Sequence, residues 1–291
     1  MAELLRGAPV ASALTENTRA RTDALREVGV IPTLAIVRVG ERPDDLSYER
    51  GACKRAEKAG VETRRVLLPE TCSQDELMGV IERVNANDGV HGCLLLRPLP
   101  PQLDEHAACE ALDPRKDVDS ITSASLAGVF AGTDEGFPPC TAEAVMQILA
   151  YYGRDLTGAR VTVVGRSLVV GKPVSIMLQA QNATVTMCHT RTRDLPAECR
   201  RAEVLVVAAG HARTVGADCV SPGQTVIDVG VNWDETAGNF VGDVDFDAVE
   251  PIVGAITPVP GGVGAVTTAV LMSHVATAAE RAFRSSGGQA A

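Results

Sequence analysis

The residues best suited to binding a charged ligand lie between positions 161 and 173. The first four are a β-branched run without alternation, which predicts a strand buried on both faces. Gly165 permits a tight turn, Gly171 falls where a helix would begin, and Pro173 suits a first helical turn. Such a turn directs free backbone N–H groups and the positive end of a helix at one point, which favours a phosphate. An ordinary strand–helix turn would look similar, because the spacing is not G-x-G-x-x-G.

A run of hydroxyl and cationic side chains, residues 189–193, follows the next predicted strand, Thr184–Cys188. In dinucleotide-binding folds an acidic residue here holds the ribose 2′-hydroxyl, whereas an arginine accommodates a 2′-phosphate. No carboxylate occurs before Asp194, and Arg166 adds a cation at the glycine turn. The pattern favours NADP over NAD. A solvated basic loop is the alternative, and His189 by itself is more typical of a packed histidine than of a ligand.

A second glycine-rich loop, residues 256–264, has two prolines and three glycines. The prolines stiffen the loop, and the glycines allow a ligand to approach the backbone closely. A hairpin or a simple helix-entry loop would fit the same residues. Together with a cofactor turn about 90 residues earlier, a loop that faces a binding cleft is the better interpretation.

Strands and helices alternate along the chain and must position these loops. Strands are predicted at 33–39, 62–68, 90–96, 161–164, 184–188, 204–208, 225–229 and 256. Helices are predicted up to Val28 and at 47–58, 73–85, 106–112, 142–152 and 265–284, with Ser47 and Thr141 as caps and residues 42–45 as a turn. The sequence predicts an α/β fold of two βα domains, the C-terminal one a Rossmann-like, doubly wound parallel sheet. We expect one domain at 1–140, completed by a C-terminal helix at 266–291, and another at 141–265.

The composition excludes several classes of function. Apolar residues make up 45% and charged residues 22%, as in an ordinary globular protein, while the net charge of −10 and 3% aromatics argue against nucleic-acid or membrane-surface binding. The eight cysteines form no C-x-x-C pair, so we expect no metal site. No signal peptide and no apolar run of about 18 residues occur. A reducing cytoplasm is therefore expected.

Several further motifs occur in one order over residues 30 to 285. They are Tyr48 with Lys54 and Gly60; Pro98-Leu99-Pro100; Lys116-Asp117-Val118-Asp119; Pro139-Cys140-Thr141; Gly165-Arg166-Ser167 with Val170 to Pro173; Asp228 to Asn232; Val241 to Val244; and Ile256 to Gly264. In this combination the chain resembles the methylenetetrahydrofolate dehydrogenase/cyclohydrolase (FolD) family. The last motif is the most specific.

The resemblance implies an enzyme of one-carbon metabolism. Its members oxidise 5,10-methylenetetrahydrofolate to the methenyl form with hydride transfer to NADP+, and many then hydrolyse the methenyl ring. It also implies a homodimer that binds tetrahydrofolate derivatives in a cleft between the two domains.

The resemblance also implies roles for particular residues. Gly165, Arg166 and Ser167 would hold the cofactor phosphates, Thr190 and Arg191 would lie at the 2′-phosphate, and Val231 would contact the cofactor through its backbone. Tyr48 would stack along the pterin, and Asp119 would accept hydrogen bonds from the pterin N–H groups. The implied substrate-binding set is Tyr48, Ala52, Leu96, Arg97, Pro98, Asp119, Pro260, Gly261, Gly262, Val263 and Gly264, and the implied catalytic set is Tyr48, Arg97 and Asp119.

Two positions depart from the family pattern. Members with both activities have a lysine four residues after the tyrosine, where this chain has Ala52. Lys54 is rotated by about 200° from that position on a helix and cannot replace it. Arg97 stands where the family has a glutamine. It could orient a water or stabilise negative charge, but it is a poor proton shuttle; it could also simply pair with a nearby carboxylate.

These departures leave the dehydrogenase as the expected activity and put the cyclohydrolase in doubt. Hydride transfer depends mainly on alignment of substrate and cofactor, which the departures do not touch. Cyclohydrolase activity could be weak, absent, or based on a rearranged site at Arg97. A non-catalytic relative that binds folate and NADP is a further alternative. A generic short-chain reductase is disfavoured, because no Tyr-x-x-x-Lys pair occurs after Val161.

Overall fold

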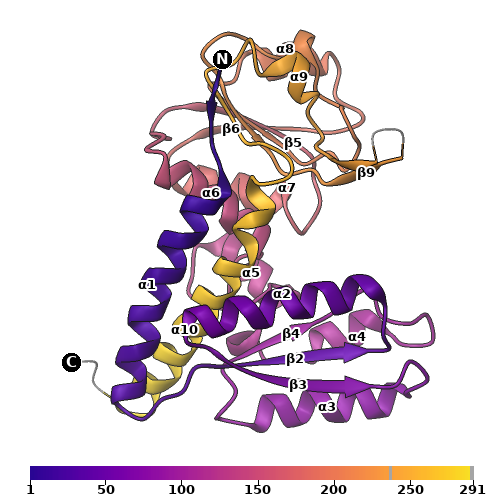
Figure 1. Ribbon diagram of the computed structural model, residues 1–291, viewed down its shortest axis with the longest axis vertical. Helices are drawn as coiled ribbons and strands as arrows, with labels where there is room; N and C mark the ends of the chain where they lie inside the picture. The colour runs from indigo at the N-terminus through magenta and orange to yellow at the C-terminus, as the bar shows by residue number, and fades with distance from the viewer. Residues whose placement is uncertain (236–237, 289–291) are drawn as a thin grey trace. The chain divides into compact units, whose positions relative to one another are not determined.

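The computed structural model describes residues 1–235 and 238–288. Its contacts divide the chain into two compact units (Figure 1). A three-stranded unit consists of Ser12–Cys140 and Thr268–Ala291, and a six-stranded unit consists of Met1–Ala11 and Thr141–Thr267. Each unit has its own sheet, and the two are described separately.

The three-stranded unit is built on a parallel sheet in the order β3-β2-β4. Every residue of its central strand is buried, as expected for a strand covered on both faces. Helices α2 and α3 lie on opposite faces of this sheet (Figure 1). The elements are β2 (Thr33–Val39), α2 (Pro43–Ala59), β3 (Glu62–Leu68), α3 (Gln74–Ala86), β4 (Gly92–Leu95), α4 (Glu105–Glu110), η1 (Pro114–Lys116) and α5 (Ser123–Ala131).

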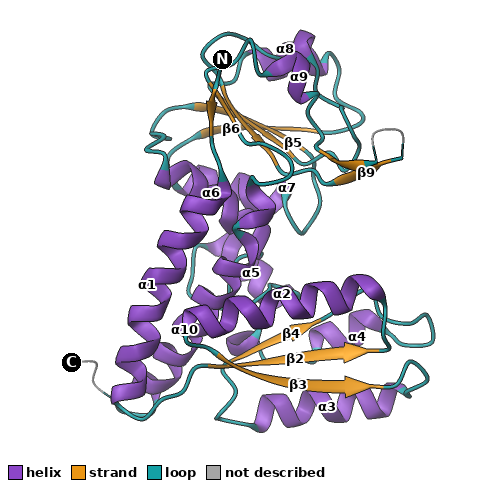
Figure 2. Cartoon of the chain, viewed as in Figure 1, coloured by secondary structure: helices purple, strands orange, loops and turns teal. Residues whose placement is uncertain are grey.

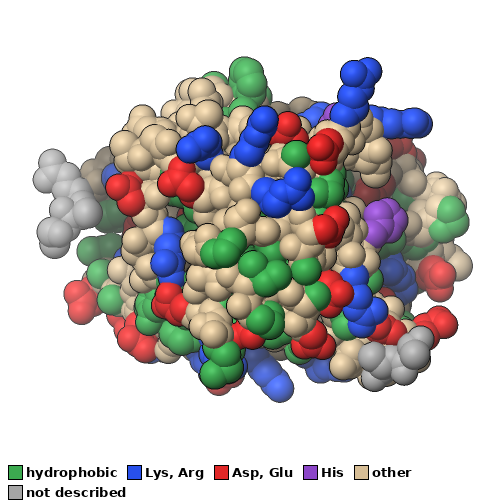
Figure 3. Space-filling model, turned by 90° about the horizontal axis from the view of Figure 1, so that it is seen from above, with side chains coloured by type: hydrophobic (Ala, Val, Ile, Leu, Met, Phe, Trp, Pro, Cys, Tyr) green, Lys and Arg blue, Asp and Glu red, His purple; other side chains and the backbone are tan. Residues whose placement is uncertain are grey.

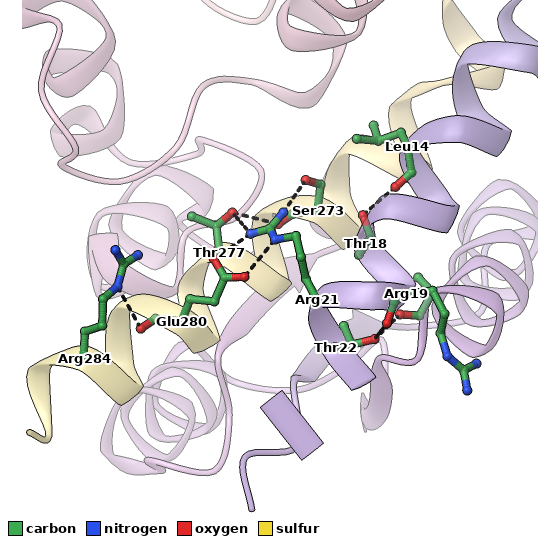
Figure 4. Close-up of polar contacts among 10 residues, drawn as sticks. Leu14, Thr18, Arg19, Arg21, Thr22, Ser273, Thr277, Glu280 and Arg284 are labelled. Atoms are coloured by element: carbon green, nitrogen blue, oxygen red, sulfur yellow. Dashed lines mark hydrogen bonds and ion pairs between the residues drawn. The ribbon is translucent and has the colours of Figure 1, made fainter. Parts of the chain in front are cut away.

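Helices α1 (Gly7–Glu27) and α10 (Thr267–Ser285) pack side by side through a polar network (Figure 4). The Arg21 guanidinium donates two hydrogen bonds of 2.8 Å to the Glu280 carboxylate. It also donates to the hydroxyls of Ser273 and Thr277. A bidentate Arg–carboxylate pair fixes the relative orientation of its two side chains as well as their distance. This network therefore anchors α10 on α1.

The six-stranded unit has a parallel sheet in the order β1-β11-β8-β7-β5-β6. Figure 2 draws its strands in orange, with β5 and β6 labelled. This is the predicted Rossmann-like α/β architecture. Its strands are β1 (Glu3–Leu4), β5 (Arg160–Val164), β6 (Thr184–Cys188), β7 (Val204–Val207), β8 (Thr225–Asp228) and β11 (Ala255–Ile256), with a hairpin of β9 (Asn232–Asp234) and β10 (Asn239–Val241). Its helical segments include α6 (Cys140–Tyr151), α7 (Gly171–Ala180), α8 (Leu195–Arg200), η2 (Ala217–Cys219), α9 (Phe246–Val249) and η3 (Val263–Ala265).

The N-terminus corrects the prediction of a single helix up to Val28. Residues 3 and 4 form β1, which pairs in parallel with β11. Residues 1–11 therefore belong to the six-stranded unit, whereas the sequence placed them with the first domain. The pairing joins segments about 250 residues apart, so no local pattern indicates it.

Several other predicted elements were wrong, including the cap at Thr141, which lies within α6 (Cys140–Tyr151). Residues 42–45, predicted as a turn, include the start of α2, because Pro43 occupies the first helical turn, and Ser47 lies within that helix. Helix α5 was not predicted. The last helix begins at Thr267 because the three residues before Val266 form a 3₁₀ turn.

Two surface properties complete the description. Basic and acidic side chains are interspersed on the face shown in Figure 3. Within residues 1–235 and 238–288, no helix has the length and apolar character needed to cross a membrane.

Candidate functional site

Tyr48 and Asp119 lie close together in the three-stranded unit, and Cys140 lies beside them. Tyr48 is on α2 and keeps 38% of its surface exposed. Burial of the phenol group raises its pKa, and the nearby Asp119 and Cys140 raise it further. Burial also raises the pKa of Asp119 to about 6, although a hydrogen bond from Cys140 and the charge of Arg97 act in the opposite direction. The site thus combines a neutral phenol with a carboxyl group that titrates near neutrality.

Helix α2, which bears Tyr48, is held on the sheet by a buried ion pair. Arg38 of β2 donates from Nε to Glu49 Oε2 at 2.8 Å, and only 6–7% of either side chain is exposed. Glu49 also faces Arg65 of β3 at 3.5 Å. Because Glu49 follows Tyr48 directly, the pair fixes the helix at the position where the tyrosine projects.

The lysine and first aspartate of the Lys116-Asp117-Val118-Asp119 motif have structural roles. Lys116 Nζ donates to three carbonyl groups at the end of α3, at 2.7 to 2.9 Å. The Val84 and Asn87 carbonyls each also accept one backbone N–H, from Asn87 and Val90. The buried lysine therefore adds a charged donor at the C-terminus of α3. Asp117 accepts four hydrogen bonds at the start of α5, from Ile121 N, Thr122 N, Thr122 Oγ1 and Ser125 Oγ. Both residues fix the segment that presents Asp119.

His274 of α10 fixes the same segment from another side. Its Nδ1 lies 2.9 Å from the Val118 carbonyl oxygen, which can only accept, so Nδ1 bears the proton. The Cys140 Sγ lies 3.4 Å from the same oxygen and 3.8 Å from Nδ1. Burial lowers the pKa of His274 to about 4, so the ring is neutral at physiological pH. Neither His274 nor Cys140 was predicted as a site residue, because their contacts join segments distant in sequence.

Ala52 is completely buried on α2, one turn beyond Tyr48. Lys54 is exposed, which confirms that it points away from position 52. The structure therefore places no lysine of this helix at the position where the family pattern has one.

Arg97 lies just after β4 and pairs with Glu105, the first residue of α4, at 3.6 Å. One alternative given above for Arg97 was a simple ion pair with a nearby carboxylate, and Glu105 supplies that carboxylate. The adjacent Leu96 is buried, whereas Pro98 is exposed and its carbonyl accepts from Arg42 Nη1 at 3.0 Å. Sequence reasoning missed Glu105, whose only signal was its place at a helix start.

In the six-stranded unit, the turn after β5 has the backbone geometry that requires glycine. Gly165 has a φ of 132°, and a Cβ built there would lie 2.1 Å from the Ala208 carbonyl oxygen. A Cβ on Gly171 would lie 2.3 Å from the Gly165 oxygen. The first residues of the turn, Arg166 and Ser167, are exposed, and α7 begins at Gly171. The backbone therefore forms an open cradle at a helix N-terminus, which suits a phosphate group.

The loop after β6 fits a ligand with an additional phosphate. Thr190, Arg191 and Arg193 are all exposed at the carboxyl end of this strand. Asp194, the first carboxylate in the loop, caps α8 by accepting from Ala197 N. Because Asp194 is engaged with its own helix, cations and a hydroxyl remain as the groups at the strand end, and these residues fit NADP.

Two buried aspartates organise the loops around Val231. Asp228 accepts from the backbone N–H groups of Gly230, Asp243 and Val244, and burial raises its pKa to about 7. Asp243 accepts from Asn232 Nδ2 and Gly210 N. Val231 itself is 60% exposed. The Asp228 and Asp243 motifs thus shape the loop, while Val231 is left on its surface.

The second glycine-rich loop contacts the N-terminal segment of the same unit. Gly261 has a φ of 101°, and its carbonyl accepts from Gly7 N at 2.8 Å. Pro260, Gly261 and Gly264 are exposed, whereas Gly262 and Val263 are buried. That this loop lines the folate side stays a prediction.

The described residues do not include a group of three or more His, Cys, Asp or Glu side chains arranged to hold a metal ion. The fold and the glycine turn define the class: an α/β protein with a Rossmann-like unit for a dinucleotide. Comparison with known proteins narrows this class. The model of the tetrahydrofolate dehydrogenase/cyclohydrolase catalytic domain matches residues 5–119, and that of the NAD(P)-binding domain of the same family matches residues 139–283.

Relatives agree with this match over almost the full length. The bifunctional protein FolD of Carboxydothermus hydrogenoformans is 51% identical over 281 residues, covering 96% of this chain and 98% of the relative. That of Clostridioides difficile is 48% identical, covering 95% and 96%. The crystal structure of the bifunctional FolD of Campylobacter jejuni has a TM-score of 0.92 at 35% identity, covering 97% and 99%. The chain belongs to the tetrahydrofolate dehydrogenase/cyclohydrolase family.

A solved structure from Trypanosoma brucei adds a cofactor to the comparison. This methylenetetrahydrofolate dehydrogenase-cyclohydrolase was crystallised with NADP and an inhibitor, and matches with a TM-score of 0.89 at 33% identity, covering 97% of this chain and 99% of that one.

Proposed function

We propose that the chain oxidises 5,10-methylenetetrahydrofolate to 5,10-methenyltetrahydrofolate in one-carbon metabolism, with NADP+ as hydride acceptor. The observation behind the proposal is that Tyr48 and Asp119 are near enough for the carboxylate to raise the pKa of the phenol, in a chain that also has the family's NAD(P)-binding domain. The ionised Asp119 carboxylate is suited to accept hydrogen bonds from pterin N–H groups. The neutral Tyr48 phenol offers a flat, partly exposed ring for stacking.

NADP is the cofactor that the residues of the six-stranded unit favour. When bound, it supplies the hydride-accepting ring, which no side chain can provide. Gly165, Arg166 and Ser167 are proposed to hold its phosphates, and Thr190 and Arg191 its 2′-phosphate. Val231 is proposed to contact the cofactor through its backbone. Arginine binds phosphate in a bidentate way and remains protonated, which supports these roles.

Cyclohydrolase activity is proposed to be weak or absent. Ala52 cannot supply the cation or proton that a lysine would, and Arg97 is engaged with Glu105. An arginine also exchanges protons poorly at neutral pH. Tyr48 and Asp119 are retained, so the departures affect the hydrolytic step more than substrate binding.

A paired assay of the purified chain tests both parts of this proposal. We expect NADPH formation from methylenetetrahydrofolate, with a much smaller rate on NAD+. Methenyltetrahydrofolate should decay at about the uncatalysed rate. Robust decay that Arg97→Ala abolishes would instead establish a rearranged hydrolytic site, and binding of NADP and folate without turnover would establish a non-catalytic relative.

The same proposal includes the assembly and setting of the protein. We infer a homodimer of a cytoplasmic protein, as the resemblance to the family implies. Sedimentation analysis of the purified chain tests this assembly. A monomeric mass at micromolar concentration would contradict the proposed homodimer.

A further inference from the structure

The carbonyl oxygen of Val118 accepts from two buried side chains that belong to other elements. Nδ1 of His274, on α10, lies 2.9 Å from this oxygen, and Sγ of Cys140, at the start of α6, lies 3.4 Å from it. Only 8% of His274 and 3% of Cys140 is exposed. A carbonyl oxygen has two lone pairs, so the two donors together fill its capacity. The Val118 carbonyl group is therefore held by two separate contacts.

The side chain of Val118 is enclosed beside the same helix. It is completely buried, and a Cβ built on Gly92, the first residue of β4, would lie 2.8 Å from Val118 Cγ1 and 3.0 Å from Val275 Cγ2. Val118 and Val275 thus both pack over this glycine. Two consecutive residues of α10 hold Val118, because His274 binds its carbonyl group and Val275 shares its packing site.

The placement of Asp119 depends on this carbonyl group. The carbonyl of Val118 and the N–H and Cα of Asp119 belong to one planar peptide unit, so a rotation of the carbonyl moves the aspartate backbone with it. Beyond that Cα, only two side-chain torsions lead to the carboxylate. A contact that fixes the carbonyl therefore also restricts where the carboxylate lies.

We propose that His274 is a positioning residue for folate binding, because it holds the Val118 carbonyl and thereby directs Asp119 toward the pterin. This inference rests on the proposed function. It assigns a role to a residue of α10 that acts through the backbone of Asp119 and not on the substrate itself.

The imidazole ring of His274 is itself held in place. Its centroid lies 5.0 Å from that of the Phe137 ring, and the Arg281 guanidinium lies 4.7 Å from the centroid of the same phenylalanine. Arg281 also donates to the Gly136 carbonyl at 2.9 Å. The ring thus has a packing role as well as a hydrogen bond, and the test must separate the two.

Two substitutions make this separation. His274→Asn keeps a donor for the Val118 carbonyl but loses the ring, whereas His274→Phe keeps an aromatic ring beside Phe137 but has no donor. The dissociation constant of tetrahydrofolate would be measured by anaerobic calorimetry at neutral pH. We expect His274→Phe to bind about tenfold more weakly, since small misplacements of a binding group have large effects, and His274→Asn to stay within about twofold of the wild type.

Three controls keep the comparison specific. The affinity for NADP+ should not change, because the residues proposed to bind it lie in the six-stranded unit. His106→Phe, the same change at an exposed position of α4, should leave tetrahydrofolate binding unchanged. If His274→Phe shows no cooperative unfolding transition in urea, His274→Leu takes its place as the variant without a donor.

A double-mutant cycle with Asp119→Asn tests the route of the effect. In that background, which keeps an acceptor oxygen but no charge, His274→Phe should weaken binding by less than about twofold. Full additivity would overturn the proposal, because His274 would then act independently of Asp119. If this background binds too weakly to measure, the comparison of His274→Phe with His274→Asn decides by itself.

Two results of that comparison would also overturn the proposal. Wild-type affinity in a folded His274→Phe would show that the hydrogen bond does not position Asp119. Equal losses in His274→Asn and His274→Phe would show that the ring matters only by its packing. A wild-type chain that binds no tetrahydrofolate would instead overturn the proposed function, before any variant is compared.

Discussion

At the scale of single residues, neighbouring residues of one motif have different roles. Some hold the surrounding backbone in place, and others belong to the candidate site itself. Lys116 and Asp117 are engaged with α3 and α5, whereas Asp119, two positions on, lies beside Tyr48. The motif resemblance pointed to Asp119 but could not separate these roles, because the partners of Lys116 are backbone carbonyls with no sequence signal. The same holds for Asp228 and Asp243, which bind loop N–H groups.

Replacing Lys116 by methionine should therefore destabilise the fold. Methionine has a similar length but no donor, so three carbonyls at the end of α3 would each lose a hydrogen bond from a charged donor. We expect the free energy of unfolding to fall by about 2 to 3 kcal/mol in urea denaturation. The matched change Lys54→Met, at an exposed position of α2, should stay within about 0.5 kcal/mol. Equal effects of the two substitutions would contradict a structural role for Lys116.

Gly165 offers a second test at this scale. Gly165→Ala would bring a methyl group against the Ala208 carbonyl oxygen, at a φ that side chains rarely adopt. We expect loss of at least 2 kcal/mol of stability, of the size typical for overpacking, and a large loss of NADP+ affinity by calorimetry. Gly51→Ala is the control: it adds the same methyl group in open space within α2 and should raise stability by about 0.5 to 1 kcal/mol. Unchanged NADP+ affinity in Gly165→Ala would argue against the cradle.

At the scale of elements, the sequence predicted best where a local signal sets the structure. The strand at 184–188 and the start of α7 at Gly171 were found as predicted. The helix predicted from residue 73 begins with a capping box formed by Ser73 and Glu76. The hairpin β9–β10 was missed because each strand has only three residues, too few for a pattern to emerge. Helix α5 was missed although Thr122 caps it locally by accepting from Ser125 N. The buried carboxylate of Asp117 holds the same helix start by a contact that the sequence does not reveal.

The missed hairpin provides a probe of cofactor binding. The chain has a single tryptophan, Trp233, which is 58% exposed and packs edge-to-face on Phe240 with ring centroids 5.2 Å apart. Val231 precedes it by two residues, immediately before β9 begins at Asn232. If Val231 contacts the cofactor, titration with NADP+ should change the tryptophan emission.

The control for this titration is Trp233→Phe, which keeps an aromatic ring on the hairpin. It should abolish the signal while leaving stability within about 0.5 kcal/mol, because the position is largely exposed. An emission unaffected by NADP+ at concentrations that saturate turnover would place the cofactor away from β9.

At the scale of the whole chain, the two units are assembled from segments that no local pattern links. Residues 1–11 join the sheet of the six-stranded unit, and residues from 268 onward complete the three-stranded unit. The general prediction of two α/β domains depended on alternation of strands and helices, which is local. The partner of β1 and the docking of α10 on α1 through Arg21 and Glu280 are set by tertiary contacts alone.

His274 should make the stability of this assembly sensitive to acid. Burial holds its pKa at about 4, whereas an unfolded histidine titrates near 6.5. Between these values the unfolded state binds the proton and the folded state does not, so stability is full above pH 6.5 and falls as the pH decreases toward 4. The difference corresponds to a loss of up to about 3 kcal/mol at pH 4. Urea denaturation at a series of pH values measures this loss.

The matched variant is His274→Asn, whose side-chain amide can still donate to the Val118 carbonyl but does not titrate. Its free energy of unfolding should depend less on pH than that of the wild type between 6.5 and 4, even if it is lower at neutral pH. Protonation of Asp119 and Asp228, whose pKa values are raised to about 6 and 7, favours the folded state over the same range and is common to both proteins. The difference between the two proteins in the slope of unfolding free energy against pH therefore isolates the contribution of His274. Parallel stability–pH profiles would show that its buried ring does not control acid stability.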